Sequence, residues 1–155
     1  MSSFDKMSKS GYLIDTSVFS AFAPGRPAMP AALDAWLRLN SDRLYVPCIA
    51  IAEIEQGIRK LRRAGGTARA RRLSAWLDEL LEHYSERILP LDAAISRLAG
   101  QISDQAIAVG RHPGFPDVAI AALALHSRLT ILTRKTRHFT QLKITCVDPF
   151  EQLPH

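Results

Sequence analysis

The amino-acid sequence predicts an α/β fold, specifically a three-layer α/β/α sandwich with a central parallel sheet. Short apolar runs, typical of strands buried on both faces of a sheet, alternate along the chain with longer segments of helical periodicity. Strands that are separated by helices usually run parallel, because each helix returns the chain to the edge where the previous strand began. The sequence contains no internal repeat and no low-complexity linker that would argue for another architecture.

The spacing of apolar side chains predicts the elements of the first half of the chain. In order, these are a strand over residues 12–14, a helix over 29–41, a strand over 43–48 and helices over 49–64 and 67–84. The strands are the apolar runs YLI and RLYVPC, whereas the helices carry apolar residues every three or four positions. The break PGRP precedes the first of these helices. Gly65 and Gly66 end the helix over 49–64, because glycine commonly closes a helix.

The second half of the chain continues the alternation. The predicted elements are a strand over residues 87–92, helices over 93–109 and 117–128, and strands over 129–134 and 143–150. The stretch GRHPGFP is a predicted loop, and the helix DVAIAALALHSR that follows is so apolar that it must be buried. We therefore expect one domain over residues 11–150, between a flexible N-terminal tail (1–10) and a C-terminal tail (151–155).

Length and composition indicate a soluble globular protein. The chain has 155 residues, of which 47% are hydrophobic and 23% charged, enough for one substantial core. No run approaches the roughly 18 apolar residues that a membrane helix needs, and the N-terminus has no apolar signal core. We therefore expect a cytoplasmic location and no membrane partner.

The net charge of +5 is concentrated in the stretch RKLRRAGGTARARR, residues 59–72, which contains seven Lys or Arg residues and no acid. Such a stretch favours a polyanionic partner, most obviously nucleic acid. The alternative is a solvated pair of helices. Because the stretch has no aromatic residue on which bases could stack, it would attract backbone phosphates without reading their sequence.

Three acids lie next to apolar segments at predicted strand ends. Asp15 directly follows the first strand, Glu53 is in the first turn of the helix after the second, and Asp117 begins the buried helix. Each acid alone also suits helix capping or the helix dipole. Together they converge on the sheet edge where ligands bind, and a divalent cation is the ordinary way to hold like charges there. Oxygen ligands, without closely spaced Cys or His, select Mg²⁺ or Mn²⁺ over zinc.

Four stretches in this order, YLIDTSVFSAF, IAEIEQGI, PDVAIAALA and LTRKTRHF, resemble the PIN-domain family. Within that family the chain is similar to the VapC-type toxin ribonucleases of bacterial toxin–antitoxin pairs and to PilT N-terminal-like proteins. The resemblance extends from about Gly11 to Phe150 and implies a PIN-like fold. It also implies that Asp15, Glu53 and Asp117 are the catalytic and metal-binding acids.

The same resemblance implies roles for neighbouring polar residues. Ser17 matches a small polar position two residues after the first aspartate, and Thr133 matches the threonine of a Thr-Arg-Asn-like motif. Thr16 and Ser17 are expected to orient Asp15. Arg134 and Lys135, at the end of a predicted strand, are candidates to contact substrate phosphate, although simple surface solvation is the alternative.

The sequence departs from the family pattern at two positions. Lys135 stands where relatives have Asn or Asp, and His138 stands where many have Asp. Without a fourth acid we expect one tightly bound divalent ion rather than two. His138 is expected to flank the pocket or pair with a neighbour rather than bind metal. Asp148 is a weaker substitute for the missing acid, because Asp before Pro149 favours a turn.

The function that the resemblance implies is a metal-dependent endoribonuclease that acts as the toxin of a type II toxin–antitoxin pair. It implies an RNA substrate, a cognate antitoxin protein, a homodimer, and hydrolysis that leaves a 5′-phosphate and a 3′-hydroxyl. Lys135 and His138 leave open an alternative, a PIN-fold RNA- or protein-binding module with weak or no catalysis. A nucleotide-binding protein is disfavoured, because no GxGxxG or GxxxxGK[ST] loop follows the first strand.

Overall fold

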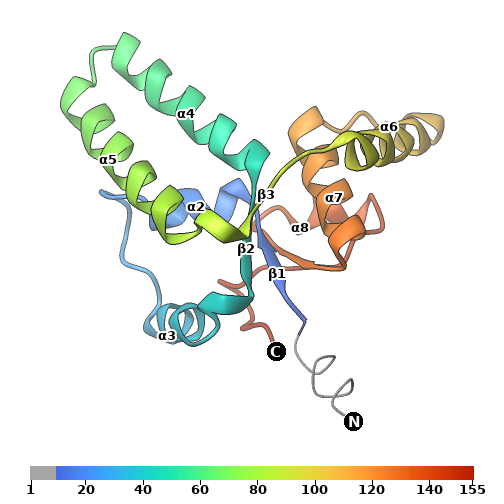
Figure 1. Ribbon diagram of the computed structural model, residues 1–155, viewed down its shortest axis with the longest axis horizontal. Coiled ribbons are helices and arrows are strands. Elements are labelled where there is room, and N and C mark those ends of the chain that lie inside the picture. Colours follow the sequence, from blue (N-terminus) through green and yellow to red (C-terminus); the bar gives the residue numbers. More distant parts are fainter. Residues whose placement is uncertain (1–9) are drawn as a thin grey trace.

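The computed structural model describes residues 10–155, which form a five-stranded parallel sheet with helices on both faces (Figure 1). The strands lie in the order β3-β2-β1-β4-β5. Their bounds are Tyr12–Ile14 (β1), Leu44–Pro47 (β2), Ile88–Leu89 (β3), Thr130–Leu132 (β4) and Cys146–Val147 (β5). The central strand β1 pairs in parallel with both β2 and β4. The predicted three-layer α/β/α sandwich with a central parallel sheet is confirmed.

The helices connect successive strands. They are α2 (Thr16–Phe22), α3 (Ala31–Leu39), α4 (Cys48–Arg63), α5 (Thr67–His83), α6 (Ala93–Ala108), α7 (Phe115–Ser127) and α8 (Thr136–Thr140), with 3₁₀ turns η1 (Ser41–Arg43) and η2 (Ser85–Arg87). None of the helices in this part of the chain is both long enough and apolar enough to cross a membrane. The predicted N-terminal tail lies, apart from Ser10, outside the described residues.

Alternation of side chains along β1 divides the core into two layers. Leu13 is buried in a cluster with residues of α6 and α7, whereas Tyr12 and Ile14 are buried on the other face with residues of α2 and α5. The same alternation holds on β4, where Ile131 belongs to the first cluster and Leu132 to the second. Helix α7 is buried continuously from Asp117 to Ala124, as its apolar sequence predicted.

Four of the five strands are shorter than their apolar runs predicted, and β3 and β5 are shortened most. Only Ile88 and Leu89 of the run over 87–92 form β3, since Pro90 follows and has no N–H to donate. Only Cys146 and Val147 of the last run form β5. The residues before it belong to a turn in which Lys143 has a φ of 61°. Helix α8 is an addition that the sequence did not predict, and its buried anchor is Phe139.

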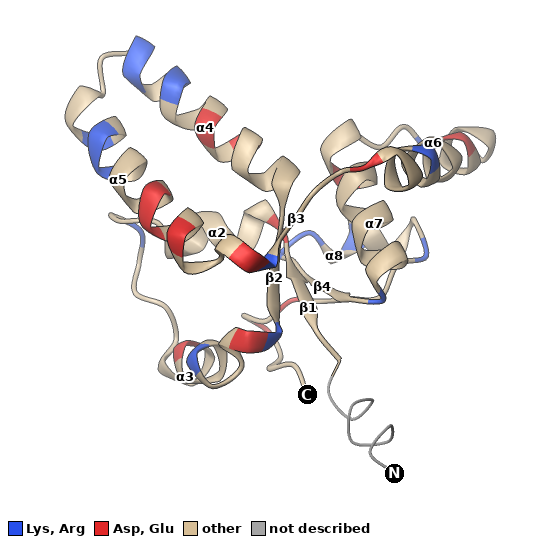
Figure 2. Cartoon of the chain, viewed as in Figure 1, with Lys and Arg blue, Asp and Glu red and all other residues tan. Residues whose placement is uncertain are grey.

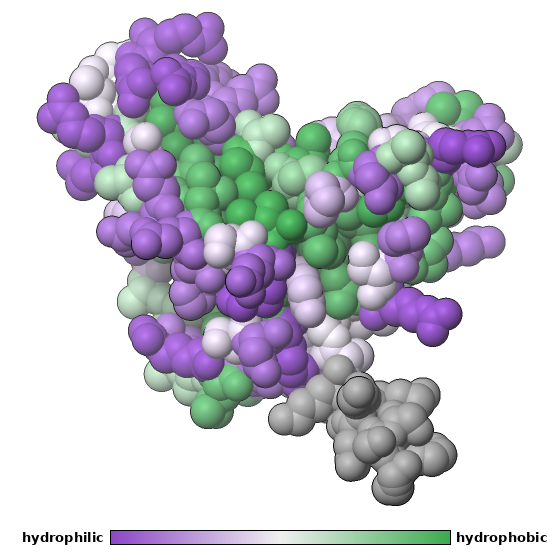
Figure 3. Space-filling model, in the orientation of Figure 1, coloured by the Kyte–Doolittle hydropathy of each residue, from purple (hydrophilic) through white to green (hydrophobic). Residues whose placement is uncertain are grey.

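Helices α4 and α5 form a hairpin that projects away from the sheet (Figure 1). Gly65 makes the turn with a φ of 95°, a backbone conformation that glycine adopts without steric cost. The Gly66 N–H donates to the carbonyl of Leu61 over 3.0 Å and so closes the end of α4. Figure 2 shows Lys and Arg gathered toward the far end of this hairpin, and Figure 3 shows a hydrophilic far end above a more hydrophobic base.

The last residues of the chain return to the sheet. Pro154 is buried, and the Tyr12 hydroxyl donates a hydrogen bond of 2.6 Å to the carbonyl of His155. The C-terminal end is therefore held against the beginning of β1, at the edge of the sheet opposite the end of that strand.

Candidate active site

Asp15 lies directly after β1 and joins the sheet to α2. Its N–H donates to the carbonyl of Leu132 over 2.9 Å, which extends the pairing of β1 with β4 by one residue. Its own carbonyl accepts from the N–H groups of Val18 and Phe19, the first turn of α2. Asp15 occupies the N-cap position, but its side chain makes no capping hydrogen bond. The backbone starts the helix, and the carboxylate is left available for another purpose.

The Asp15 carboxylate is fully buried and only half satisfied. Its Oδ2 accepts hydrogen bonds from Ser17 Oγ (2.7 Å) and Thr133 Oγ1 (2.8 Å). Its Oδ1 is buried and has no hydrogen-bond partner among the described residues. An unpaired buried carboxylate oxygen is costly, and a cation is the partner that compensates it most strongly. This orphaned oxygen fits a divalent metal ion.

The two hydroxyl groups that bind Asp15 are themselves fixed by the backbone. Ser17 Oγ accepts from the N–H of Arg134 (3.0 Å), and Thr133 Oγ1 accepts from the N–H of Lys135 (2.9 Å). Because each hydroxyl has a single proton, these bonds leave that proton directed at Asp15. The start of the segment after β4 therefore orients the carboxylate at the end of β1.

Glu53 lies in the second turn of α4 and not, as the sequence predicted, in the first turn, because the helix begins at Cys48. The Thr16 hydroxyl donates to Glu53 Oε1 over 2.6 Å. The expectation that Thr16 orients Asp15 is therefore wrong, whereas the expectation for Ser17 agrees with its contact. The reason is geometric: Thr16 is the first residue of α2, and its side chain is directed toward α4 rather than back to the sheet.

Asp117 lies in the first turn of α7, and both of its oxygens are held by basic side chains. Lys135 Nζ lies 2.8 Å from Oδ1, and His138 Nδ1 lies 2.8 Å from Oδ2. The Asp117 side chain is only 12% exposed. Lys135 is the N-cap residue of α8 and His138 lies in that helix, so the unpredicted helix α8 brings both to Asp117. His138 pairs with a neighbour, as expected.

The pair of Asp117 and Lys135 is charged over a wide pH range. Burial raises the pKa of Asp117, but the hydrogen bonds and positive charges of Lys135 and His138 outweigh it and hold that pKa below 3.8. Burial lowers the pKa of Lys135, yet its hydrogen bond to Asp117 and the charges of Asp15, Asp117 and Glu53 raise that pKa above 10.5. The Lys135 ammonium therefore interacts electrostatically with all three predicted acids.

The acids do not form a closed metal-binding cluster in this conformation. Across residues 10–155, no group of three or more His, Cys, Asp or Glu side chains is arranged to hold a metal ion. Glu53 accepts a hydrogen bond from Thr16, Asp15 accepts from Ser17 and Thr133, and Asp117 is bound to Lys135 and His138. The sequence placed all three acids at one edge of the sheet but did not reveal which partners each would have.

The remaining predicted residues have mainly structural contacts. The Arg134 guanidinium lies over the Phe150 ring, 4.5 Å from its centroid, and the side chain remains exposed. Asp148 Oδ1 accepts from the N–H of Phe150 over 2.9 Å, which makes the turn that the sequence predicted around Pro149. Asp148 is therefore used by that turn and does not supply a fourth acid.

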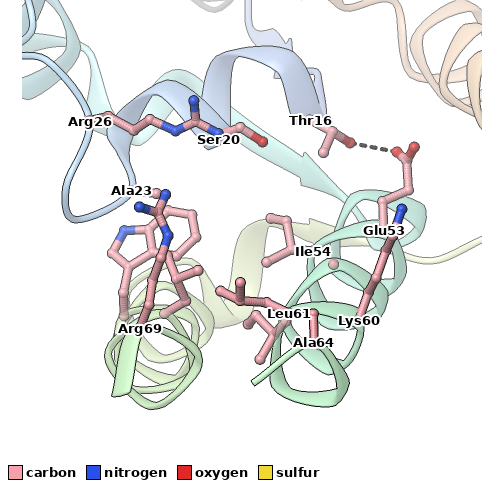
Figure 4. A pocket seen from close by; sticks show the side chains of 14 residues that line it. Thr16, Ser20, Ala23, Arg26, Glu53, Ile54, Lys60, Leu61, Ala64 and Arg69 are labelled. Atoms are coloured by element: carbon pink, nitrogen blue, oxygen red, sulfur yellow. Dashed lines mark hydrogen bonds between the residues drawn. The ribbon is translucent and has the colours of Figure 1, made fainter. Parts of the chain in front are cut away.

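A cavity of about 460 Å³ adjoins the site between α2, α4 and α5 (Figure 4). Thr16 and Glu53, joined by their hydrogen bond, lie at one end, and Arg26 and Arg69 lie at the other. Its wall is largely apolar and includes Ile54, Ile58, Leu61, Leu73 and Trp76. This cavity could not be predicted from the sequence, because its walls come from three separate helices and apolar periodicity does not reveal how those helices pack.

Comparison with known proteins places this arrangement in a family. The PIN domain family model matches residues 12–144. Toxin FitB of Neisseria gonorrhoeae is 30% identical over 139 residues, which cover 89% of this chain and 97% of FitB. VapC ribonuclease Y4jK of Sinorhizobium fredii is 28% identical over 140 residues, or 90% of this chain and 97% of that protein.

Solved structures agree with this assignment. The crystal structure of FitAcB from Neisseria gonorrhoeae has a TM-score of 0.73 to this chain at 29% identity, covering 90% of this chain and 98% of the other. The order of strands, the acid after β1 and the family match over most of the domain all lead to one conclusion. This chain belongs to the PIN domain family.

Proposed function

We propose that this protein is a metal-dependent endoribonuclease and the toxin component of a type II toxin–antitoxin pair. The observation that carries the proposal is the buried Asp15 carboxylate, whose Oδ1 has no partner while its Oδ2 is fixed by two hydroxyls. Similarity to proteins named Toxin FitB and VapC ribonuclease supports both the chemistry and the biological role.

Asp15 and Glu53 are the residues that would hold Mg²⁺ or Mn²⁺, with Asp117 completing the charge of the site. Oxygen ligands of this kind suit these ions. When bound, the metal supplies the Lewis acidity and the activated water that phosphodiester hydrolysis needs. Ser17 and Thr133 hold Asp15 in one orientation, and Thr16 does the same for Glu53.

In the proposed reaction, a water oxygen bonds to phosphorus and the bond from phosphorus to the 3′-oxygen breaks. The water gives up a proton and the 3′-oxygen gains one, so the products are a 5′-phosphate and a 3′-hydroxyl. The side chains of this chain orient the substrate but do not act as nucleophile. Exposed Arg134 and the basic stretch over residues 59–72, at the far end of the α4–α5 hairpin, would attract the phosphate backbone.

The proposed partner is a small cognate antitoxin. Its chain would lie in the largely apolar cavity between α2, α4 and α5, and a basic side chain would reach the carboxylates in place of metal. A homodimer and a cytoplasmic location complete the proposal. A structure of the complex in which no antitoxin side chain contacts Asp15, Glu53 or Asp117 would contradict this mode of inhibition.

The test is cleavage of cellular RNA with Mg²⁺ or Mn²⁺ and with EDTA, alongside growth arrest on expression. We expect the parent to cut only with metal and Asp15→Asn to be inactive. Asp104→Asn, which removes an exposed acid on α6, is the matched control and should cut like the parent. Growth arrest that persists in Asp15→Asn would contradict the catalytic proposal.

A second candidate function is a PIN-fold module that binds RNA or protein without cutting. The specific observation that favours it is the occupation of both Asp117 oxygens by Lys135 and His138. RNA that binds equally in EDTA and in Mg²⁺, without cleavage in either and without toxicity, would favour this module over the nuclease.

A further inference from the structure

The two positions at which the chain departs from the family pattern meet at one acid. Lys135 Nζ contacts Asp117 Oδ1 and His138 Nδ1 contacts Asp117 Oδ2, each over 2.8 Å. Asp117 is thus fully bonded by this chain's own side chains, whereas buried Asp15 Oδ1 has no partner among the described residues. The carboxylate oxygen without a partner therefore belongs to Asp15, whereas the lysine ammonium is bound to Asp117.

Both the backbone and the side-chain ammonium of Lys135 are held by hydrogen bonds. Its backbone N–H donates to Thr133 Oγ1 over 2.9 Å, which ties it to the network around Asp15. Its ammonium is bonded to Asp117, and its side chain is 36% exposed. A lysine side chain loses rotational freedom when it is held in one position, which costs free energy. Because both the backbone and the ammonium of Lys135 are held, we infer that its charge has a defined role in the site.

We propose that Lys135 takes the place of a second metal ion: its ammonium neutralises Asp117 permanently, so that the site binds one divalent ion, and it contacts the phosphate under attack. This inference rests on the proposed nuclease function. The three carboxylates carry three negative charges, which one divalent ion and one ammonium balance completely. A second divalent ion would give the site a net positive charge. The Lys135 ammonium would repel that ion and so oppose its binding.

The ammonium has unused donors for this task. Lysine carries three N–H groups, and one is used by Asp117. With Asp117 held by His138 on its other oxygen, Lys135 can turn a second donor toward a phosphate oxygen without releasing the carboxylate. A positive charge aimed at the oxygens of a phosphate in hydrolysis stabilises the transition state. Lys135 would then be a catalytic residue.

The experiment counts bound Mn²⁺ by calorimetric titration of the full chain at neutral pH. We expect one site in the parent and a second in Lys135→Asp, which replaces the ammonium by a carboxylate. Lys135→Arg keeps the charge and should retain one site. Lys143→Asp makes the same exchange at an exposed residue outside the site and is the matched control, with one site expected. Two sites in the parent would overturn the inference, as would a Lys135→Asp protein that still binds one ion with unchanged affinity.

Melting curves in EDTA provide a readout that needs no metal. Lys135→Met should melt at a lower temperature than the parent, because Asp117 loses its cation. When Lys135→Met is added to a protein that already carries Asp117→Asn, the melting temperature should change little. Equal effects of Lys135→Met in both backgrounds would show that the ammonium is not coupled to Asp117, and would overturn the inference.

RNA cleavage separates this inference from the proposed function. A parent that binds one Mn²⁺, gains a second site in Lys135→Asp and cuts no RNA would overturn the nuclease assignment and the phosphate contact of Lys135, while supporting the replacement of a metal by Lys135. A parent that cuts RNA with two bound Mn²⁺ ions would support the nuclease and overturn the role of Lys135.

Discussion

Replacement of Thr133 by valine removes a hydroxyl without changing the shape of the side chain. Thr133 is fully buried after β4, and its hydroxyl donates to Asp15 Oδ2 (2.8 Å) and accepts from the Lys135 N–H (2.9 Å). The substitution therefore breaks two hydrogen bonds and leaves Asp15 with Ser17 as its remaining donor among the described residues. It tests directly whether the segment after β4 fixes the Asp15 carboxylate.

The expected cost follows from these contacts. A hydrogen bond to a charged group contributes about 1.5–3 kcal/mol, and the neutral bond from the Lys135 N–H about 1 kcal/mol. Burial of the additional methyl group offsets about 0.8 kcal/mol. The free energy of unfolding should therefore fall by about 2–3 kcal/mol, a decrease in melting temperature of roughly 5–10 °C for a domain of this size.

Activity should fall as well, because Asp15 loses part of its orientation. Loss of a residue that orients a metal ligand typically reduces metal affinity or activity by about 10–100-fold. The assays are urea unfolding in EDTA and RNA cleavage at saturating Mg²⁺. Thr133→Ser keeps the hydroxyl and should retain most of the activity, while losing only the packing of one methyl group.

The reasoning would be refuted by a Thr133→Val protein that unfolds at the same urea concentration as the parent and cuts RNA at the parent rate. A loss of activity shared equally by Thr133→Ser would also contradict it, because that variant retains the hydroxyl and therefore both hydrogen bonds.

Three further predictions concern the charges of the site. Asp15→Asn should abolish cleavage yet leave the metal-free protein at least as stable as the parent in urea unfolding, because a buried charge with an unpaired oxygen is removed. Millimolar Mg²⁺ or Mn²⁺ should raise the melting temperature of the parent, EDTA should reverse the shift, and Asp15→Asn should weaken it, since metal that binds only the folded state stabilises it. Because the folded-state pKa of Asp117 lies below its ordinary value, the Asp117–Lys135 pair stabilises the protein above about pH 4 and loses this contribution as the pH falls further. Acid unfolding of Asp117→Asn should lack that component.

The fold could be predicted from the sequence because its elements have strong local signals. The alternation of Tyr12, Leu13 and Ile14 between two cores is what a strand buried on both faces requires, and the continuously apolar α7 has only one place to lie. The predicted ends of strands were less accurate where a proline or a turn, rather than the end of an apolar run, limits the strand. Pro90 and the turn at Lys143 shorten β3 and β5 although apolar residues continue beyond them.

The candidate site could be predicted only in part. Positions at strand ends and helix starts placed Asp15, Glu53 and Asp117 at one edge of the sheet, but partners are set by side-chain directions that periodicity does not encode. Thr16 and Ser17 are adjacent in sequence, yet one donates to Glu53 and the other to Asp15. Helix α8 was missed because its five residues contain one apolar anchor, which is too little for a periodic signal.

The segment over residues 133–138 contacts two of the three acids of the site. It supplies a donor to Asp15 through Thr133 and both donors to Asp117 through Lys135 and His138. Its structural role is carried separately, by buried Phe139 at the next position and by the backbone of α8. Because Lys135 and His138 are partly exposed and do not belong to either core, they can vary without loss of the fold. We therefore expect a change at these two positions to alter how many cations the carboxylates accept, while the sheet that positions the carboxylates stays the same.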